Sequence, residues 1–173
     1  MLARVHGGLD RGLALVEGAM AIAAGAVVVA IMALVSLDAV LRHVFAEPLT
    51  FQIHLTQFYL LVAATMLALP WGYRRGGAIQ VRLLLDRLPH RVGEAIVRIG
   101  LMASALYLLA LAWRARAIFA KAWVDDEVVM GVIDWPVAWS WIWVPLGCAV
   151  LAVRLLVDAS APALRPIGAG GHE

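Results

Sequence analysis

Long apolar segments alternate with short charged segments along this chain. Residues 18–37 contain no charged side chain, and at 1.5 Å per residue they span about 30 Å, the thickness of a hydrocarbon core. Further apolar segments cover residues 51–73, 95–113 and 135–157. The pattern predicts an all-α integral membrane protein, in which a single membrane domain over residues 1–173 contains four transmembrane helices.

The longest polar interruption lies between the second and third apolar segments. Within it, residues 79–88 alternate at helical spacing between apolar and charged positions, which is typical of an amphipathic helix lying in the membrane interface. The arginines of this region are expected to stop translocation and to contact anionic lipid headgroups; they are Arg74, Arg75, Arg82 and Arg87.

The remaining segments are predicted to flank the helices. Residues 1–17 form a short polar lead, residues 38–50 a loop or short interfacial helix, and residues 158–173 a flexible tail rich in Ala, Pro and Gly. The first apolar segment is too long for the core of a signal peptide, so an uncleaved helix is favoured. Asp38 and Arg42 are four positions apart and are expected to pair if the first helix extends outward.

Proline positions predict two features of the fourth helix. Asp134, Trp135 and Pro136 are typical of a helix start, with Asp134 as the N-cap and Pro136 in the first turn. Pro145 is expected to kink the helix, as Pro70 is in the second helix, because proline has no N–H to donate.

Composition and charge placement support a membrane location and predict its topology. The chain is 64% hydrophobic, far above a soluble domain. Ten of its 14 Lys and Arg residues lie in the N-terminal lead, the region around residues 74–98 and the C-terminal end. The positive-inside rule therefore places both termini in the cytoplasm, and the acidic residues of the first and third loops outside.

The candidate chemistry is sparse. No catalytic or nucleotide-binding motif occurs, no basic run indicates nucleic-acid binding, and the lone Cys148 lies in an apolar segment, so neither an enzyme nor a cofactor is expected. His54 lies near the outer end of its segment, where it is interpreted as a hydrogen-bonding residue rather than a haem ligand. No carboxylate falls at mid-helix, which favours a partner of a transporter over a conducting unit.

The residues alone leave three classes open. The first is a subunit that assists a transporter. The second is a four-helix anchor or assembly subunit of another complex, such as a respiratory complex. The third is a small carrier that works as a homodimer.

Several motif residues, taken in their order along the chain, make the sequence resemble the small membrane subunit of tripartite ATP-independent periplasmic (TRAP) transporters, the DctQ-like family. The resemblance covers about residues 42–157 and is carried by Arg42, Phe45 and Pro48, then Arg75, Gly76, Leu88 and Pro89, then Pro136, Trp139, Pro145 and Gly147. The chain departs from the family's pattern at Ala78 and Arg82, where that family often has His and Asp.

The resemblance implies a specific role in the bacterial inner membrane. Such a multi-pass subunit acts with a large membrane subunit, which carries the substrate and sodium sites, and with a periplasmic binding protein that delivers an organic acid. It is expected to scaffold the large subunit and to help dock the binding protein. The charged residues predicted to lie outside, and therefore the candidates for docking, are Arg42, Glu47, Asp125, Asp126 and Glu127.

Overall fold

Two very long helices dominate the chain in this computed structural model, which describes residues 2–77, 89–129 and 134–161. α1 covers Leu2–Val44 and α5 covers His90–Val124. Neither contains a proline, whereas Pro48 follows α1 closely and Pro89 immediately precedes α5. Because proline cannot donate a backbone hydrogen bond in a helix interior, these residues help to set where the long helices end and begin.

The second and fourth apolar segments form composite helices. The second is α2 (Gln52–Leu55), the π-helix η1 (Thr56–Leu60) and α3 (Leu61–Arg74) in direct succession. The fourth is α6 (Ala138–Trp141) and α7 (Trp143–Ala159), with a break at Ile142.

Three local predictions were wrong. The lead before residue 18 is helical from Leu2, and α1 continues to Val44 instead of giving way at Asp38 to a loop or a separate short interfacial helix. Trp135–Pro136 is a strand, β2, which pairs antiparallel with β1 (Val128–Val129), so α6 begins only at Ala138. Charged residues near the ends of α1 indicate the limits of the apolar span, but they do not end the helix. Pro136 is tolerated in β2 because a two-stranded sheet consists of edge strands.

Two other predictions fall on residues outside the described ranges. They are the interfacial helix at residues 79–88 and most of the tail, from residue 162 onward. The part of the predicted tail that is described continues α7 to Ala159.

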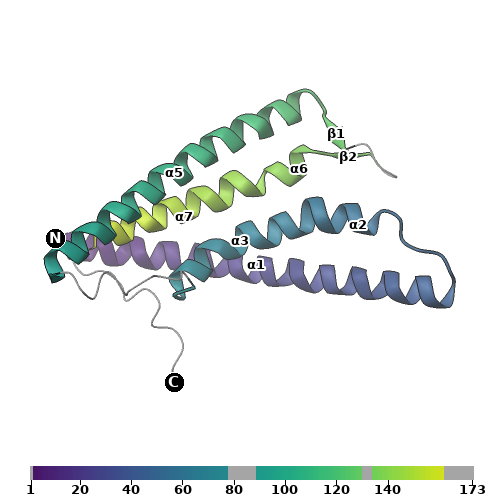
Figure 1. The fold of residues 1–173 in the computed structure, drawn as a ribbon, viewed down its shortest axis with the longest axis horizontal. Helices are drawn as coiled ribbons and strands as arrows, with labels where there is room; N and C mark the ends of the chain where they lie inside the picture. Colours follow the sequence, from purple (N-terminus) through teal and green to yellow (C-terminus); the bar gives the residue numbers. More distant parts are fainter. Residues whose placement is uncertain (1, 78–88, 130–133, 162–173) are drawn as a thin grey trace, which may run out of the picture.

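The helices pack side by side in the order α1, α3, α7, α5 (Figure 1). α1 and α5 form the two edges of this layer, and they contribute fewer buried residues to their membrane spans than the two inner helices do. The helices are close together at the end with Leu2 and Ala159, here called the inner end. They spread apart at the end with Val44 and Val124, the outer end.

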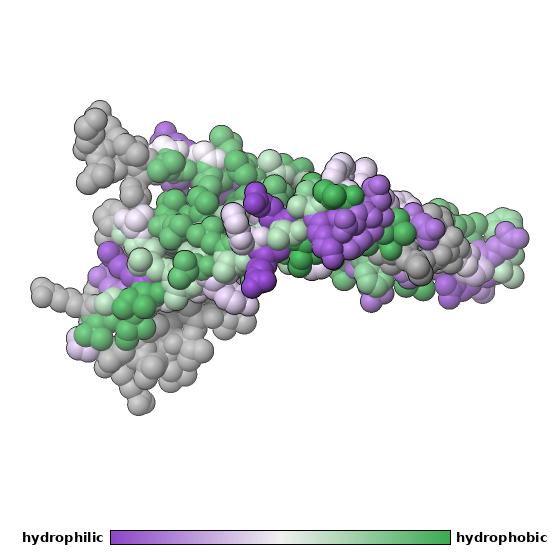
Figure 2. Space-filling model, turned by 90° about the horizontal axis from the view of Figure 1, so that it is seen from above, coloured by the Kyte–Doolittle hydropathy of each residue, from purple (hydrophilic) through white to green (hydrophobic). Residues whose placement is uncertain are grey.

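Small residues allow the close approach of neighbouring helices. Ala105 is fully buried within the α5–α7 pair, Ala152 of α7 is also fully buried, and Ala24 packs with Met20 and Leu67 between α1 and α3. Large apolar side chains are instead exposed, including Ile22 on α1 and Leu106 on α5. Figure 2, which looks onto the α5 edge, shows this apolar surface over the inner half and hydrophilic residues toward the outer end.

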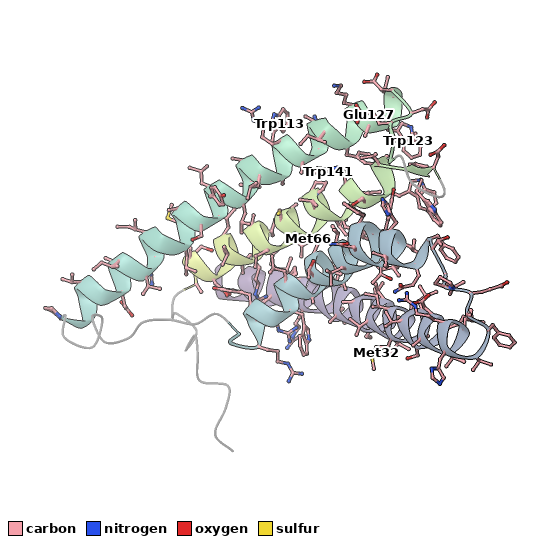
Figure 3. All side chains as sticks on the ribbon, turned by 45° about the vertical axis from the view of Figure 1, so that its right-hand side comes forward. Met32, Met66, Trp113, Trp123, Glu127 and Trp141 are labelled. Atoms are coloured by element: carbon pink, nitrogen blue, oxygen red, sulfur yellow. The ribbon has the colours of Figure 1, made fainter. Side chains whose placement is uncertain are left out.

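The closest approach of α3 and α7 depends on Pro70 and Gly147. Pro70 has no N–H for the carbonyl of Met66, four residues earlier, yet α3 continues through it. Gly147 of α7 packs directly on that carbonyl oxygen, and a Cβ atom there would overlap it. Met66 accordingly lies between α3 and α7 (Figure 3). The Met66 carbonyl receives no backbone hydrogen bond from Pro70. A weak Cα–H···O contact from Gly147 to this carbonyl is therefore favourable.

We expect Gly147→Ala to lower the free energy of unfolding by about 1–3 kcal/mol, because the added methyl group must push two backbones apart. Thermal unfolding of the purified protein in detergent measures this loss. Gly100→Ala is the matched control, since a Cβ atom at Gly100 of α5 meets no neighbour. Equal melting temperatures for the two variants would contradict the assigned role of Gly147.

Candidate functional site

A cluster of charged side chains is buried at the inner end of the layer. Arg154 of α7 is fully buried, and its Nη1 atom donates to Asp10 Oδ1 of α1 at 2.8 Å. Its Nε atom lies 3.5 Å from Glu17 Oε1 of α1 and 3.7 Å from Asp158 Oδ2, one turn further along α7. The sequence pattern did not predict this buried charge, which lies near the helix ends and not at mid-helix.

Arg74 brings α3 into the same cluster. Its Nη1 atom lies 3.6 Å from Glu17 Oε2 and donates to the carbonyl oxygen of Ala14 at 3.2 Å. Glu17 is itself fully buried, so its carboxylate sits between guanidinium groups of two different helices. Arg74, predicted as a lipid-headgroup anchor, thus also links helices within the protein.

The chemistry of this cluster is ion pairing. Isolated charges in a membrane protein are costly to bury, and neighbouring opposite charges offset that cost. Within the described ranges, no group of three or more His, Cys, Asp or Glu side chains is placed to hold a metal ion. The arrangement joins the first, second and fourth membrane-spanning segments at one level of the molecule.

A second charged arrangement lies at the outer end of α1. Asp38 is buried, and its Oδ2 atom accepts from Arg42 Nη2 at 3.0 Å, so the predicted pair is confirmed. Its Oδ1 atom accepts the backbone N–H of Leu49 at 2.7 Å. One carboxylate therefore fixes both the last turn of α1 and the chain reversal that follows it.

Two hydroxyl groups tie η1 to the β-hairpin and to α6. The Tyr59 hydroxyl lies 3.2 Å from the carbonyl oxygen of Trp135 and 3.1 Å from that of Pro136. The Ser140 hydroxyl of α6 donates to the carbonyl of Phe58. The wider π turn displaces the usual helical hydrogen bonds, which makes a carbonyl in this turn accessible to such a donor.

The five predicted docking residues lie at the outer end but in two separate places. Arg42 lies in the last turn of α1 and Glu47 just after that helix, whereas the acidic group Asp125, Asp126 and Glu127 follows α5 at the opposite edge of the layer (Figure 1). All five are exposed. Glu127 lies 3.9 Å from Lys121 Nζ, and its carbonyl accepts the N–H of Val137.

Two arginines stack on tryptophans near the ends of the apolar segments. Arg75 lies 4.8 Å from the ring centre of Trp71 on α3, and Arg116 lies 4.6 Å from that of Trp113 on α5. Such pairs combine a cation–π contact with an aromatic ring that prefers the membrane interface. Arg82 and Arg87, the other predicted anchors, lie outside the described residues.

The motif residues have mostly local structural roles. Gly76 has a positive φ of 81°, in the turn that ends α3, where a side chain is disfavoured. Phe45 and Pro48 lie in the chain reversal after α1, Pro136 is in β2, and Pro145 is in α7 three residues after the break at Ile142. Trp139 is 65% exposed on α6, and Leu88 is not described.

The sequence contains a signal for the buried cluster. Glu17 borders the predicted first span, and Arg154 precedes the end of the predicted fourth span. The predicted topology places both residues near the cytoplasmic side. Opposite charges at one depth on two helices are candidates for pairing.

The fold and these sites define a polytopic membrane protein. Among the described residues, four helices are long and apolar enough to cross a membrane; they are Gly8–Val44, Gln52–Arg74, Val92–Val124 and Ala138–Ala159. Their exposed large apolar side chains suit contact with lipid or with other membrane helices.

Residues 31–164 match the DctQ component of tripartite ATP-independent periplasmic transporters. Since the match covers most of the sequence, the chain belongs to this family and is a small membrane subunit of a TRAP transporter. No individual curated protein matches the chain significantly.

We expect Arg154→Leu to destabilise the protein by about 3–5 kcal/mol, because it leaves buried carboxylates without their shared cation. Lys121→Ala should change stability by about 0–1 kcal/mol, since Lys121 forms an exposed ion pair. Unfolding in detergent compares the two variants. The double variant Arg154→Leu/Glu17→Leu should be less destabilised than the sum of its single changes, and strict additivity would contradict direct coupling.

Proposed function

We propose that this chain is the fixed scaffold of its transporter, packing against the large membrane subunit and helping to dock the substrate-binding protein during sodium-coupled uptake of an organic acid. The observation that carries the proposal is the single-layer arrangement of α1, α3, α7 and α5. A layer one helix thick has no interior that could surround a solute, so a partner must supply the transport path.

The distribution of charge supports the scaffold role. The buried ion pairs of Glu17 and Arg154 lie at the inner end, and buried Asp38 lies near the outer end. Along α1, Glu17 and Asp38 are separated by about 30 Å, one hydrocarbon thickness. Charged groups at both boundaries oppose movement of the layer along the membrane normal, as expected of a component that stays in place while another moves.

The orientation follows from the charge bias. We infer that the inner end faces the cytoplasm and the outer end the periplasm of a bacterial inner membrane, because most of the Lys and Arg residues in the described ranges lie toward the inner end. The exposed charged residues at the outer end then face the compartment of a soluble binding protein. Membership in a transporter family favours this role over the respiratory anchor that the residues alone left open.

Transport by reconstituted components tests the proposal. Proteoliposomes would contain this chain, the large membrane subunit of its transporter and the binding protein, each omitted in turn. We expect sodium-dependent uptake of an organic acid that is lost when this chain is omitted. Full uptake without it, or no association with the large subunit, would contradict the scaffold role.

Charge reversal distinguishes the two groups of exposed charged residues at the outer end, one at the α1 edge and one at the α5 edge. Glu47→Lys changes the α1 edge and Asp125→Lys the α5 edge, and both side chains are exposed. We expect a patch that contacts the binding protein to show a several-fold slower association after reversal, with a weaker effect at high salt, because exposed charges act mainly on encounter rates. Association kinetics measured on the reconstituted complex would show this, and unchanged rates for both variants would remove these residues from the docking surface.

A further inference from the structure

The outer part of α5 extends beyond its apolar stretch. Trp113, with Arg116 stacked on it, marks the end of that stretch, and α5 then continues to Val124. At 1.5 Å per residue this extension is about 16 Å long. It carries Arg114, Arg116 and Lys121, so it is suited to water and headgroups rather than to hydrocarbon.

A small pocket lies at the tip of this extension, between the end of α5, the β-hairpin and α6. It has a volume of about 190 Å³, and its lining includes Trp123, Val128, Pro136, Trp139 and Asp126. Figure 3 shows Trp123 at the end of α5 beside the hairpin, whereas Trp113 lies further back along α5. The pocket therefore lies at the outer end of the molecule, beyond the apolar stretch of α5.

The pocket walls are held by backbone contacts. The carbonyl of Glu127 accepts the N–H of Val137 at 2.9 Å, and the N–H of Glu127 donates to the carbonyl of Ala122 at 3.1 Å. Asp126 has a φ of 46°, which turns the chain sharply from α5 into β1. A pocket formed by a paired hairpin and a helix end is largely preformed, which favours binding.

The size and surroundings of the pocket indicate the chemistry of its occupant. An apolar cavity of about 150 Å³ holds a benzene ring, so this pocket fits one aromatic or branched aliphatic side chain. Trp123 and Trp139 are 60% and 65% exposed, which is a large apolar area for a surface in water. Lining residue Asp126 adds negative charge to the pocket, and the exposed Asp125 directly precedes it in the chain.

We propose that this pocket receives one apolar side chain from the water-soluble substrate-binding protein, with a neighbouring Lys or Arg of that protein meeting Asp125 and Asp126. The inference rests on the proposed function and names the chemistry of its docking contact. Lipid is the other candidate for an exposed tryptophan pair. These two carboxylates disfavour an anionic membrane surface and favour a basic protein segment.

Binding of the substrate-binding protein to the complete membrane complex in nanodiscs tests the pocket. Trp139→Ala removes one wall and is expected to weaken binding about tenfold or more, as for a buried aromatic contact. Asp126→Asn keeps a residue that tolerates positive φ and removes the charge, and its several-fold loss should shrink at high salt. Trp113→Ala is the matched control, since Trp113 is 66% exposed but does not line the pocket.

The readouts separate failure of the pocket from failure of the proposed function. Each variant must first co-purify with the large subunit and melt at the wild-type temperature. Wild-type affinity in both pocket variants would overturn the inference and leave the scaffold role intact, whereas absence of the wild-type complex itself would overturn the scaffold role. Quenching of fluorescence by brominated lipids that disappears in Trp139→Phe would also overturn the inference, because it would place Trp139 in the bilayer.

Discussion

The arrangement of the helices depends on the buried guanidinium group of Arg154. It pairs with Asp10 and Glu17 of α1 and with Asp158 of its own helix, and Glu17 also contacts Arg74 of α3. α1 and α7 are separated in the layer by α3 and contact each other little elsewhere. A buried ion pair is not a large net source of stability compared with good apolar packing, but it strongly disfavours arrangements in which its partners are separated. The cluster therefore specifies which helices meet at the inner end.

Packing becomes less extensive away from that cluster. At mid-layer, α3 and α7 approach each other where Gly147 packs on the carbonyl of Met66. Pro70 cannot donate the usual helical hydrogen bond to that carbonyl. At the outer end individual hydrogen bonds contribute, such as those that tie Tyr59 to the hairpin and Asp38 to Leu49. Local stability follows the density of buried contacts, so the outer end is expected to open more readily than the inner end. A surface that binds a soluble partner is compatible with such a gradient.

The sequence was sufficient to predict the helical membrane fold and the four spans, because apolar segments of membrane length are a strong signal. The family was recognised separately, from motif residues in a fixed order such as Arg42, Gly76 and Pro145. The sequence did not predict the ends of α1 and α5, since charge marks the limit of the hydrocarbon but does not end a helix that has no proline. The start of the fourth helix was also misplaced, because Asp134 and Pro136 fit a helix start as well as a hairpin edge. The pairing of Glu17 with Arg154 required knowledge of which helices are neighbours, which periodicity alone does not contain. The pocket at the tip of α5 likewise depends on the hairpin that the sequence pattern did not reveal.

The single-layer shape has a mechanical consequence within a bilayer. A flat plate of helices that is fixed to one side of a larger protein widens that protein in one direction only. Tilting the plate about an axis in the membrane plane would move its charged ends toward the hydrocarbon, on opposite sides of the axis, and the bilayer would resist through deformation and desolvation. The subunit would thus act as a lateral brace: because the bilayer resists tilting of the helix layer, it also resists rocking of the protein to which the layer is joined.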